Sequence, residues 1–117
     1  MIRNVLLFGV AVLIVACTSA PVRLQPPISL PEGVQFTLSQ PEAESVAIAG
    51  NFNGWSSTAY PMSRSSDNGV WSIIIPLPPG EHLFMYVVNG EEWVQPPFAD
   101  DFIDDGFGQT NGMVIVR

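Results

Sequence analysis

The stretch His82-Leu83-Phe84-Met85-Tyr86-Val87-Val88-Asn89-Gly90 decides the fold, because it predicts a strand that runs directly into a tight turn. Successive side chains of a strand point to opposite faces, and in residues 83–88 both faces are apolar. Asn89-Gly90 supplies the two residue types that best tolerate positive φ at the central positions of a type I′ turn. The stretch therefore predicts the first arm and the turn of a β-hairpin.

Further short apolar runs, separated by Gly, Pro and Asn, lie on either side of this stretch. They are residues 34–38, 46–48, 71–77, 93–94 and 113–116. Within the third run Trp71 is in phase with Ile73 and Ile75, so we expect Trp71 to lie in the core. No window after the first part of the chain has an apolar period of 3.6 residues. The pattern predicts an all-β fold, a β-sandwich of about seven short strands.

The N-terminus differs from the rest of the chain. Arg3 is followed by an apolar run over residues 5–16, which a single cysteine, Cys17, follows. A helix of that length rises about 18 Å, whereas the hydrocarbon core of a bilayer measures about 30 Å. Residues 1–16 are therefore predicted to be a signal helix and not a membrane span.

The boundary Ile14-Val15-Ala16-Cys17 resembles a bacterial lipobox. The resemblance implies that Cys17 is lipidated and begins the mature protein, which would be anchored to a membrane in the cell envelope. Thr18, where aspartate would favour the inner membrane, implies the outer membrane in an organism that has two. An ordinary secretory signal cut near Ser19-Ala20 is the alternative. Residues 17–31 include four prolines and predict an extended tether, which leaves residues 32–117 for one domain.

The charge balance excludes some classes of partner. Charged residues make up 13% of the chain, which has eleven acidic residues and four arginines and therefore a net charge of −7. Such a surface repels phosphate backbones, so we expect no nucleic-acid partner. Because Cys17 is the sole cysteine, residues 32–117 contain no thiolate nucleophile and no disulfide.

Several short motifs follow one another in a recognisable order. They are Ala49-Gly50-Asn51-Phe52-Asn53-Gly54-Trp55, then Gly69-Val70-Trp71, Pro78-Pro79-Gly80, Asn89-Gly90, Trp93 and Gly106-Phe107-Gly108-Gln109-Thr110-Asn111. This order and spacing resembles the glycogen-binding module of the AMP-activated protein kinase β subunit. It also resembles the early-set domains that precede isoamylases and glycogen-branching enzymes. The resemblance implies an immunoglobulin-like early-set β-sandwich.

The same resemblance implies a site for α-1,4-glucan. In the sugar-binding members two tryptophans form a platform, and the matching positions here are Trp55 and Trp93. An asparagine on the last loop bonds the sugar, which corresponds to Asn111, and an apolar residue of that loop corresponds to Phe107. The alternative for each tryptophan is a place in the core or against a turn.

Three positions depart from the family pattern. A lysine that contacts the sugar is replaced by Met85, and a threonine of the last loop is replaced by Gln109. The hairpin before Trp93 is also one residue longer. Met85 and Gln109 occupy positions whose residues belong to the family's site, so both belong to the predicted site. The changes weaken the polar half of the implied glycan site and leave the aromatic half.

Catalytic residues are not evident. His82 is the sole histidine and is predicted to be a turn or edge residue. The acids Asp100, Asp101, Asp104 and Asp105 lack the spacing of a calcium loop. They indicate a solvated loop in which the carboxylates cap turns, with a weak cation site as the alternative.

The sequence thus predicts a non-enzymatic, lipid-anchored binding module without a cofactor or metal. Its expected partner is an α-glucan. The alternative is a protein of the envelope that docks on the same sandwich, because apolar Met85 in place of lysine suits a protein as well as a sugar.

Overall fold

A computed structural model describes residues 26–65 and 68–117, and every regular element in these ranges is a β-strand. The predicted signal helix, Cys17 and most of the predicted tether lie outside the described residues. The described part of the chain contains no helix long and apolar enough to cross a bilayer. In chain order the strands are β1 (Ile28–Leu30), β2 (Gly33–Ser39), β3 (Val46–Gly50), β4 (Ser63–Arg64), β5 (Val70–Ile75), β6 (Gly80–Val88), β7 (Glu92–Val94), β8 (Asp101–Asp104) and β9 (Thr110–Val116).

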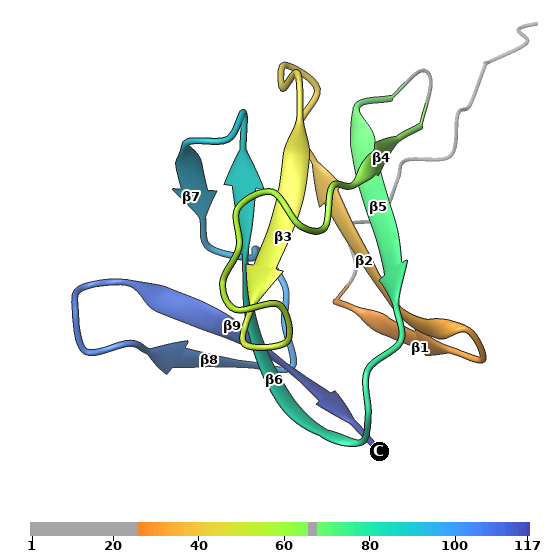
Figure 1. Ribbon diagram of the computed structural model, residues 1–117, viewed down its shortest axis with the longest axis vertical. Helices are drawn as coiled ribbons and strands as arrows, with labels where there is room; N and C mark the ends of the chain where they lie inside the picture. Colours follow the sequence, from red (N-terminus) through yellow and green to blue (C-terminus); the bar gives the residue numbers. More distant parts are fainter. Residues whose placement is uncertain (1–25, 66–67) are drawn as a thin grey trace, which may run out of the picture.

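The strands form two antiparallel sheets (Figure 1). One sheet has the order β1-β2-β5-β4, and the other has the order β3-β6-β9-β8, with β7 paired to β6. The β8–β9 hairpin forms one edge of the five-stranded sheet, and its turn extends to the left in Figure 1. This arrangement confirms the prediction of an all-β, immunoglobulin-like sandwich.

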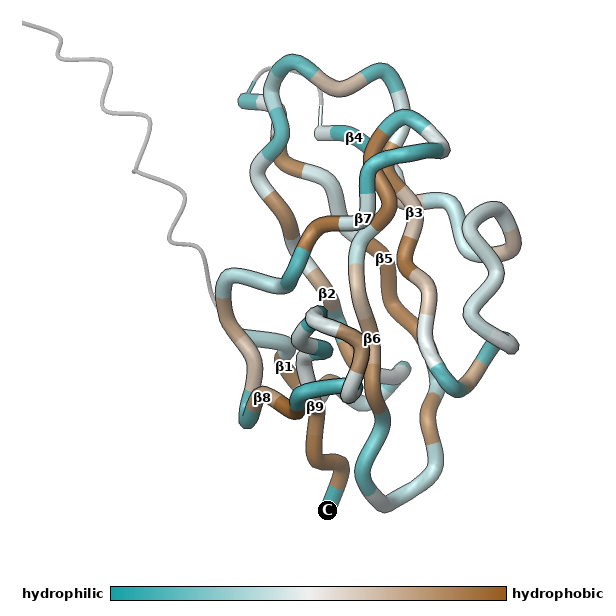
Figure 2. The backbone as a smooth tube through the Cα atoms, turned by 90° about the vertical axis from the view of Figure 1, so that its left-hand side faces the viewer, coloured by the Kyte–Doolittle hydropathy of each residue, from teal (hydrophilic) through white to brown (hydrophobic). Residues whose placement is uncertain are grey.

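The core lies between the two sheets and follows from strand alternation. On β2 the side chains of Val34, Phe36 and Leu38 are buried, while the residues between them are partly exposed. Phe36 meets Phe84 of the other sheet edge-on, with ring centroids 4.9 Å apart. Hydrophobic residues follow the strands and hydrophilic residues gather in the turns, as Figure 2 shows. Period-2 patterning therefore sets which face of each strand is buried.

A buried tyrosine links the two sheets. The Tyr86 hydroxyl of β6 donates to the backbone carbonyl of Thr37 in β2 at 3.4 Å. Burial raises the pKa of the Tyr86 hydroxyl above the usual value of 10.0, because the interior disfavours the phenolate. Trp71 is also buried, as predicted, and its indole N–H donates to the carbonyl of Gln40 at 3.0 Å.

The described residues form nine strands where the sequence predicts about seven. The strands that match none of the apolar runs, β1, β4 and β8, have four residues or fewer, too few for a periodic pattern. Each forms because a longer neighbour offers free backbone groups. β1 pairs with β2, so residues 28–30 of the range assigned to the tether belong to the sheet.

One segment closes the sandwich along an edge by contacting both sheets. The amide of Ile48 donates to the carbonyl of Tyr60 at 3.1 Å, and the amide of Met62 donates to the carbonyl of Val46 at 2.8 Å. Directly afterwards β4 pairs with β5 in the opposite sheet. Residues 60–64 therefore satisfy the outer edge of β3 and fix where the preceding loop, residues 51–59, ends.

Candidate functional site

The candidate site lies on the outer face of the five-stranded sheet, and β6 forms its floor. Phe84 and Tyr86 point into the core, so the intervening Met85 points outward. Met85 is nevertheless only 5% exposed, because neighbouring segments surround it. Val87, the next outward residue of β6, pairs with Trp93 of β7.

The loop after β3 is held by the side chain of Asn53. Its Oδ1 accepts hydrogen bonds from the amides of Gly50 at 3.1 Å and Ser56 at 3.2 Å. Its Nδ2 donates to the carbonyl of Ile48 at 3.0 Å. An asparagine amide carries both acceptor and donor groups, so one side chain ties three points of the loop together.

Trp55 stands at the tip of this loop in an unusual backbone conformation. Gly54 and Trp55 both have positive φ, 68° and 58°, and the Trp55 amide donates to the carbonyl of Gly50 at 2.9 Å. Asn51 fastens the base of the loop to Leu83 of β6, since the Leu83 amide donates to Asn51 Oδ1 at 3.1 Å. A non-glycine residue keeps a left-handed backbone conformation only where the surrounding structure stabilises it. Here the hydrogen bonds of the Trp55 amide and of Asn51 stabilise that conformation.

Trp93 is positioned by the β6–β7 hairpin. Asn89 and Gly90 have φ of 54° and 75°, as the Asn-Gly turn signal predicts. Val88 pairs with Glu92, so the loop between them contains three residues. The Asn89 side chain also accepts a hydrogen bond from the amide of Glu44 at 2.7 Å, which joins this hairpin to the chain before β3.

The last hairpin supplies the remaining side chains. Asn111 of β9 is 8% exposed and directly precedes Gly112, the partner of Phe84 on β6. Asn111 and Met85 therefore share the outer face of the sheet. Phe107, on the loop between β8 and β9, is 91% exposed.

All six side chains named from the sequence line one open hollow of about 490 Å³. Its lining consists of Trp55, Met85, Trp93, Asp105, Phe107, Gln109 and Asn111. The two tryptophans therefore lie at the surface, Trp55 half-buried and Trp93 39% exposed, and not in the core. The volume lies within the range of about 300–1,000 Å³ that is typical of small-ligand sites.

Sequence reasoning missed Asp105 as a lining residue and Asn51, Asn53 and Asn89 as supports. Among the described residues that line the hollow, Asp105 is the one that carries a charge, and it is half-buried. The asparagines do have a sequence signal. They stand next to glycines in turns, where asparagine often bonds nearby backbone.

The acidic residues near the hollow bond to backbone amides. Asp100 Oδ2 accepts from Ile115 at 2.7 Å, Asp101 Oδ1 from Phe102 at 2.8 Å, and Asp104 Oδ1 from Gly106 at 2.8 Å. The bond of Asp104 confirms its interpretation as a turn cap, whereas Asp100 bonds an amide of β9 that is 15 residues away in the chain. Asp101 and Asp104 lie in β8, so the prediction of a loop is wrong for these two residues. Within residues 26–65 and 68–117 no three His, Cys, Asp or Glu side chains come together in a way that could hold a metal ion.

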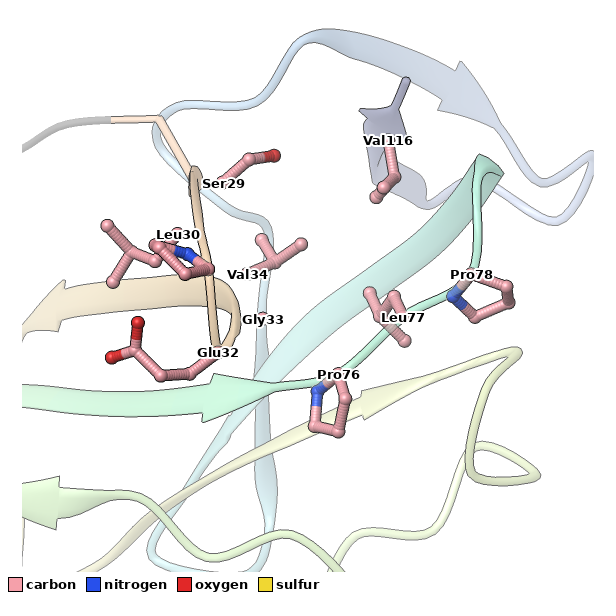
Figure 3. Close-up of a pocket in the computed structure, with 10 residues that line it drawn as sticks. Ser29, Leu30, Glu32, Gly33, Val34, Pro76, Leu77, Pro78 and Val116 are labelled. Atoms are coloured by element: carbon pink, nitrogen blue, oxygen red, sulfur yellow. The ribbon is translucent and has the colours of Figure 1, made fainter.

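A second hollow, of about 400 Å³, lies between the β1–β2 turn, the β5–β6 connection and the end of β9 (Figure 3). Aliphatic and proline side chains surround it, among them Leu30, Val34, Leu77 and Val116, together with the carboxylate of Glu32. None of the described residues that line it is aromatic. The hollow on the outer face of the five-stranded sheet is therefore the better candidate for a ligand with flat apolar faces.

His82 lies outside both hollows. Its Nε2 is 2.7 Å from the carbonyl oxygen of Pro78, and because a carbonyl can only accept, Nε2 is the donor. The ring also meets Phe52 edge-on at 6.4 Å. His82 thus bonds the turn that precedes its strand, as expected for a turn or edge residue.

The fold and the hollow define a class: an all-β, immunoglobulin-like module with an aromatic-lined open face. The chain belongs to the family of carbohydrate-binding module 48 (isoamylase N-terminal domain), which matches residues 25–99. Trp55, Met85 and Trp93 fall inside the matched range. Phe107, Gln109 and Asn111 follow it.

Similar proteins are 1,4-alpha-glucan branching enzymes. The GlgB of Mycobacterium ulcerans is 39% identical over 70 residues, which cover 60% of this chain and 10% of that enzyme. The GlgB of Pseudomonas aeruginosa is 36% identical over 69 residues, 59% of this chain and 9% of the enzyme. This chain therefore matches about a tenth of the length of these relatives.

Proposed function

We propose that this protein is a binding module for neutral α-1,4-glucan and that it performs no reaction on the glucan itself. The observation that carries the proposal is the meeting of Trp55, Trp93 and Phe107 with Asn111 in one hollow, in a chain of a carbohydrate-binding family. The similar branching enzymes carry α-glucan in their names, which supports the choice of sugar.

The chemistry of the hollow suits a glucan chain. The C–H groups of a pyranose face lie on an aromatic ring and exclude water from both surfaces, while polar side chains at the rim bond the hydroxyls. Asn111 and Gln109 each offer an amide donor and an amide acceptor at this rim. Apolar Met85 closes the floor, so the sugar meets a nonpolar surface there.

The charge around the hollow favours a neutral sugar. Its lining includes the carboxylate of Asp105, and neither Arg64 nor Arg117 lines it. With a net charge of −7 on the chain, an anionic polysaccharide would be repelled. Glycoside hydrolysis ordinarily needs two carboxyl groups that flank the bond. Among the described residues that line the hollow, Asp105 alone supplies a carboxyl group, which supports binding without catalysis.

We place the module at a membrane of the cell envelope, held by lipid on Cys17. The support is the signal-like run over residues 5–16, followed by the lipobox-like residues before the sole cysteine. Two or more acyl chains give a stable anchor because each buried CH2 contributes about 0.8 kcal/mol. The outer membrane is the expected place in an organism that has two membranes.

Calorimetric titration with maltoheptaose tests the sugar site. We would use the full-length protein in a detergent without a sugar headgroup, since a maltoside would compete for the hollow. Calorimetry is preferred to fluorescence because the variants remove fluorescent tryptophans. Saturable binding that Trp55→Ala and Trp93→Ala weaken would support the site.

The matched control is Phe98→Ala, which removes a ring of 42% exposure that does not line the hollow. Equal affinity of the wild type and both tryptophan variants would refute the site. No heat at millimolar maltoheptaose would refute glucan as the ligand. Titration with an anionic glycan such as heparin is expected to give no binding.

Mass spectrometry of the mature N-terminal peptide tests the anchor. A peptide that begins at Cys17 with added acyl mass is expected, and Cys17→Ser should release the protein from membranes. An unmodified peptide that begins after Cys17 would refute lipidation and support the ordinary secretory signal.

Docking of an envelope protein is the second candidate function. The specific observation in its favour is the 36% exposure of Ile103, which pairs with Asn111 and so lies on the same outer face of the sheet as the hollow. A protein could cover Ile103 together with the hollow, whereas a narrow glucan would leave it exposed. Site-specific crosslinking from position 103 in cells tests this candidate, and the absence of a reproducible partner would count against it.

A further inference from the structure

The loop between β8 and β9 presents its most apolar side chain to solvent without being loosely held. Phe107 is 91% exposed, more than any other large hydrophobic side chain of the described residues. An exposed phenylalanine contributes nothing to the core, so its position needs another explanation. The backbone of residues 105–109 offers one, because it is folded by its own set of hydrogen bonds.

These bonds converge on Asp105. Its Oδ1 accepts from the amide of Phe107 at 2.7 Å and from the amide of Gln109 at 3.1 Å. Its own amide donates to the carbonyl of Gln109 at 2.9 Å. Gly106 and Gly108, with φ of 83° and 90°, supply the left-handed turns on either side of Phe107.

The bonding pattern needs an acceptor in this place. One oxygen atom that receives the amides of both Phe107 and Gln109 fixes both residues relative to the end of β8. Those two side chains and Asp105 all line the hollow.

We propose that Asp105 is a positioning residue that folds residues 105–109 into a preformed arm and holds Phe107 and Gln109 at the hollow before any ligand arrives. The effect of this arm on ligand affinity rests on the proposed glucan function, whereas its folding by Asp105 does not. A loop whose backbone is already ordered in the free protein loses less freedom when a ligand binds, which favours binding. Asp105 thus acts through Phe107 and Gln109, not by touching the sugar.

Two variants separate positioning from direct contact. Asp105→Asn keeps an oxygen in the place of Oδ1 and should preserve the arm. Asp105→Ala removes the acceptor and should release it. Asp101→Ala is the matched control, since Asp101 lies at the base of the same hairpin, outside the hollow, and its Oδ1 accepts from the amide of Phe102.

The first measurement needs no ligand: amide hydrogen exchange and 15N relaxation of the full-length protein by NMR. Asp105→Ala should accelerate exchange at Phe107 and Gln109 by about tenfold or more and leave the amides of β3 and β6 unchanged. Asp105→Asn and Asp101→Ala should retain the wild-type values at both positions. Unchanged exchange in Asp105→Ala would overturn the proposal.

The second measurement is maltoheptaose affinity. Asp105→Ala should weaken the Kd about tenfold, as expected for a loop that must be ordered on binding, while Asp105→Asn should stay within about twofold. Equal losses in both variants, with wild-type exchange in Asp105→Asn, would overturn positioning and assign direct sugar contact to the charge. A wild type that binds no glucan refutes the proposed function, and the exchange data still decide whether Asp105 holds the arm.

Discussion

Replacing Asn53 with alanine should loosen the loop that carries Trp55. The variant removes the acceptor of the Gly50 and Ser56 amides and the donor to the Ile48 carbonyl, at distances of 3.1, 3.2 and 3.0 Å. A hydrogen bond contributes about 0.5–1.5 kcal/mol net, and more when its loss leaves a buried partner unpaired. Three part-buried bonds therefore correspond to about 3 kcal/mol, which access of water at the rim reduces to about 2 kcal/mol.

Urea unfolding followed by circular dichroism measures this loss. A domain of this size has an m-value near the low end of about 1–3 kcal/mol/M, so the midpoint should fall by about 1–2 M. Maltoheptaose affinity should fall as well, because Trp55 depends on the same loop. The control is Asn68→Ala, which removes two bonds outside this loop: its Oδ1 accepts from the Ser65 hydroxyl at 2.6 Å and from the Val70 amide at 3.2 Å. This control should cost less than Asn53→Ala, about 1 kcal/mol, and should leave maltoheptaose affinity unchanged.

The reasoning would be refuted if Asn53→Ala kept the wild-type midpoint. In that case the loop would be held by Phe52, whose ring stacks on Phe36 and Tyr60 at centroid distances of 6.3 and 5.9 Å, and not by the asparagine. A lower midpoint with unchanged sugar affinity would refute the link between Asn53 and Trp55 alone.

Three further predictions concern the platform, the core and the last strand. Trp93→Ala should weaken maltoheptaose about tenfold in calorimetry. Of its roughly 250 Å² about 100 Å² is exposed, and covering half of that contributes about 1.2 kcal/mol; a loss below twofold would contradict a stacking role. Burial holds the pKa of the Tyr86 hydroxyl above its unfolded value of 10.0, so the full stability of the fold is present below pH 10.0. Above pH 10.0 the free energy of unfolding should fall by about 1.4 kcal/mol per pH unit, because the unfolded chain loses the proton first. Urea midpoints of Tyr86→Phe should lack this slope, and a slope equal to the wild type's would refute its assignment. Gly112→Ala places a Cβ 2.7 Å from Pro96 Cγ, so the free energy of unfolding should fall by about 1–3 kcal/mol. Differential scanning fluorimetry should show this as a lower melting temperature, and an unchanged melting temperature would contradict the packing.

Most of the fold could be predicted because its signals are local. The alternation of Phe36 with its neighbours and the Asn89-Gly90 turn need only a few residues, and backbone sterics act over that range. β4 and β8 could not be found this way. β4 has two residues, and both strands form only because β5 and β9 lie beside them.

The candidate site was predicted by family resemblance and not by periodicity. No pattern within the chain brings Trp55 to Phe107, since the two are far apart in sequence and meet only once β3, β6 and β9 pair. The sequence predicts that Asp105 lies in a solvated loop and caps a turn, and its bonds to the amides of Phe107 and Gln109 confirm this prediction. Its place in the lining of the hollow was missed, because an aspartate in an acidic run gives no sign of the direction in which the loop folds.

By itself the sequence determined the β class of the domain, the faces that are buried and the turns that permit positive φ. It is also the sole basis for Cys17 as a lipid anchor. Only the tertiary structure decided that both tryptophans lie at the surface, that Met85 forms the floor of a hollow, and that the last hairpin brings Phe107 to its edge. The physical reason is range. Strand alternation and turn conformation depend on neighbouring residues, whereas the lining of a hollow depends on which distant strands pair and in which register.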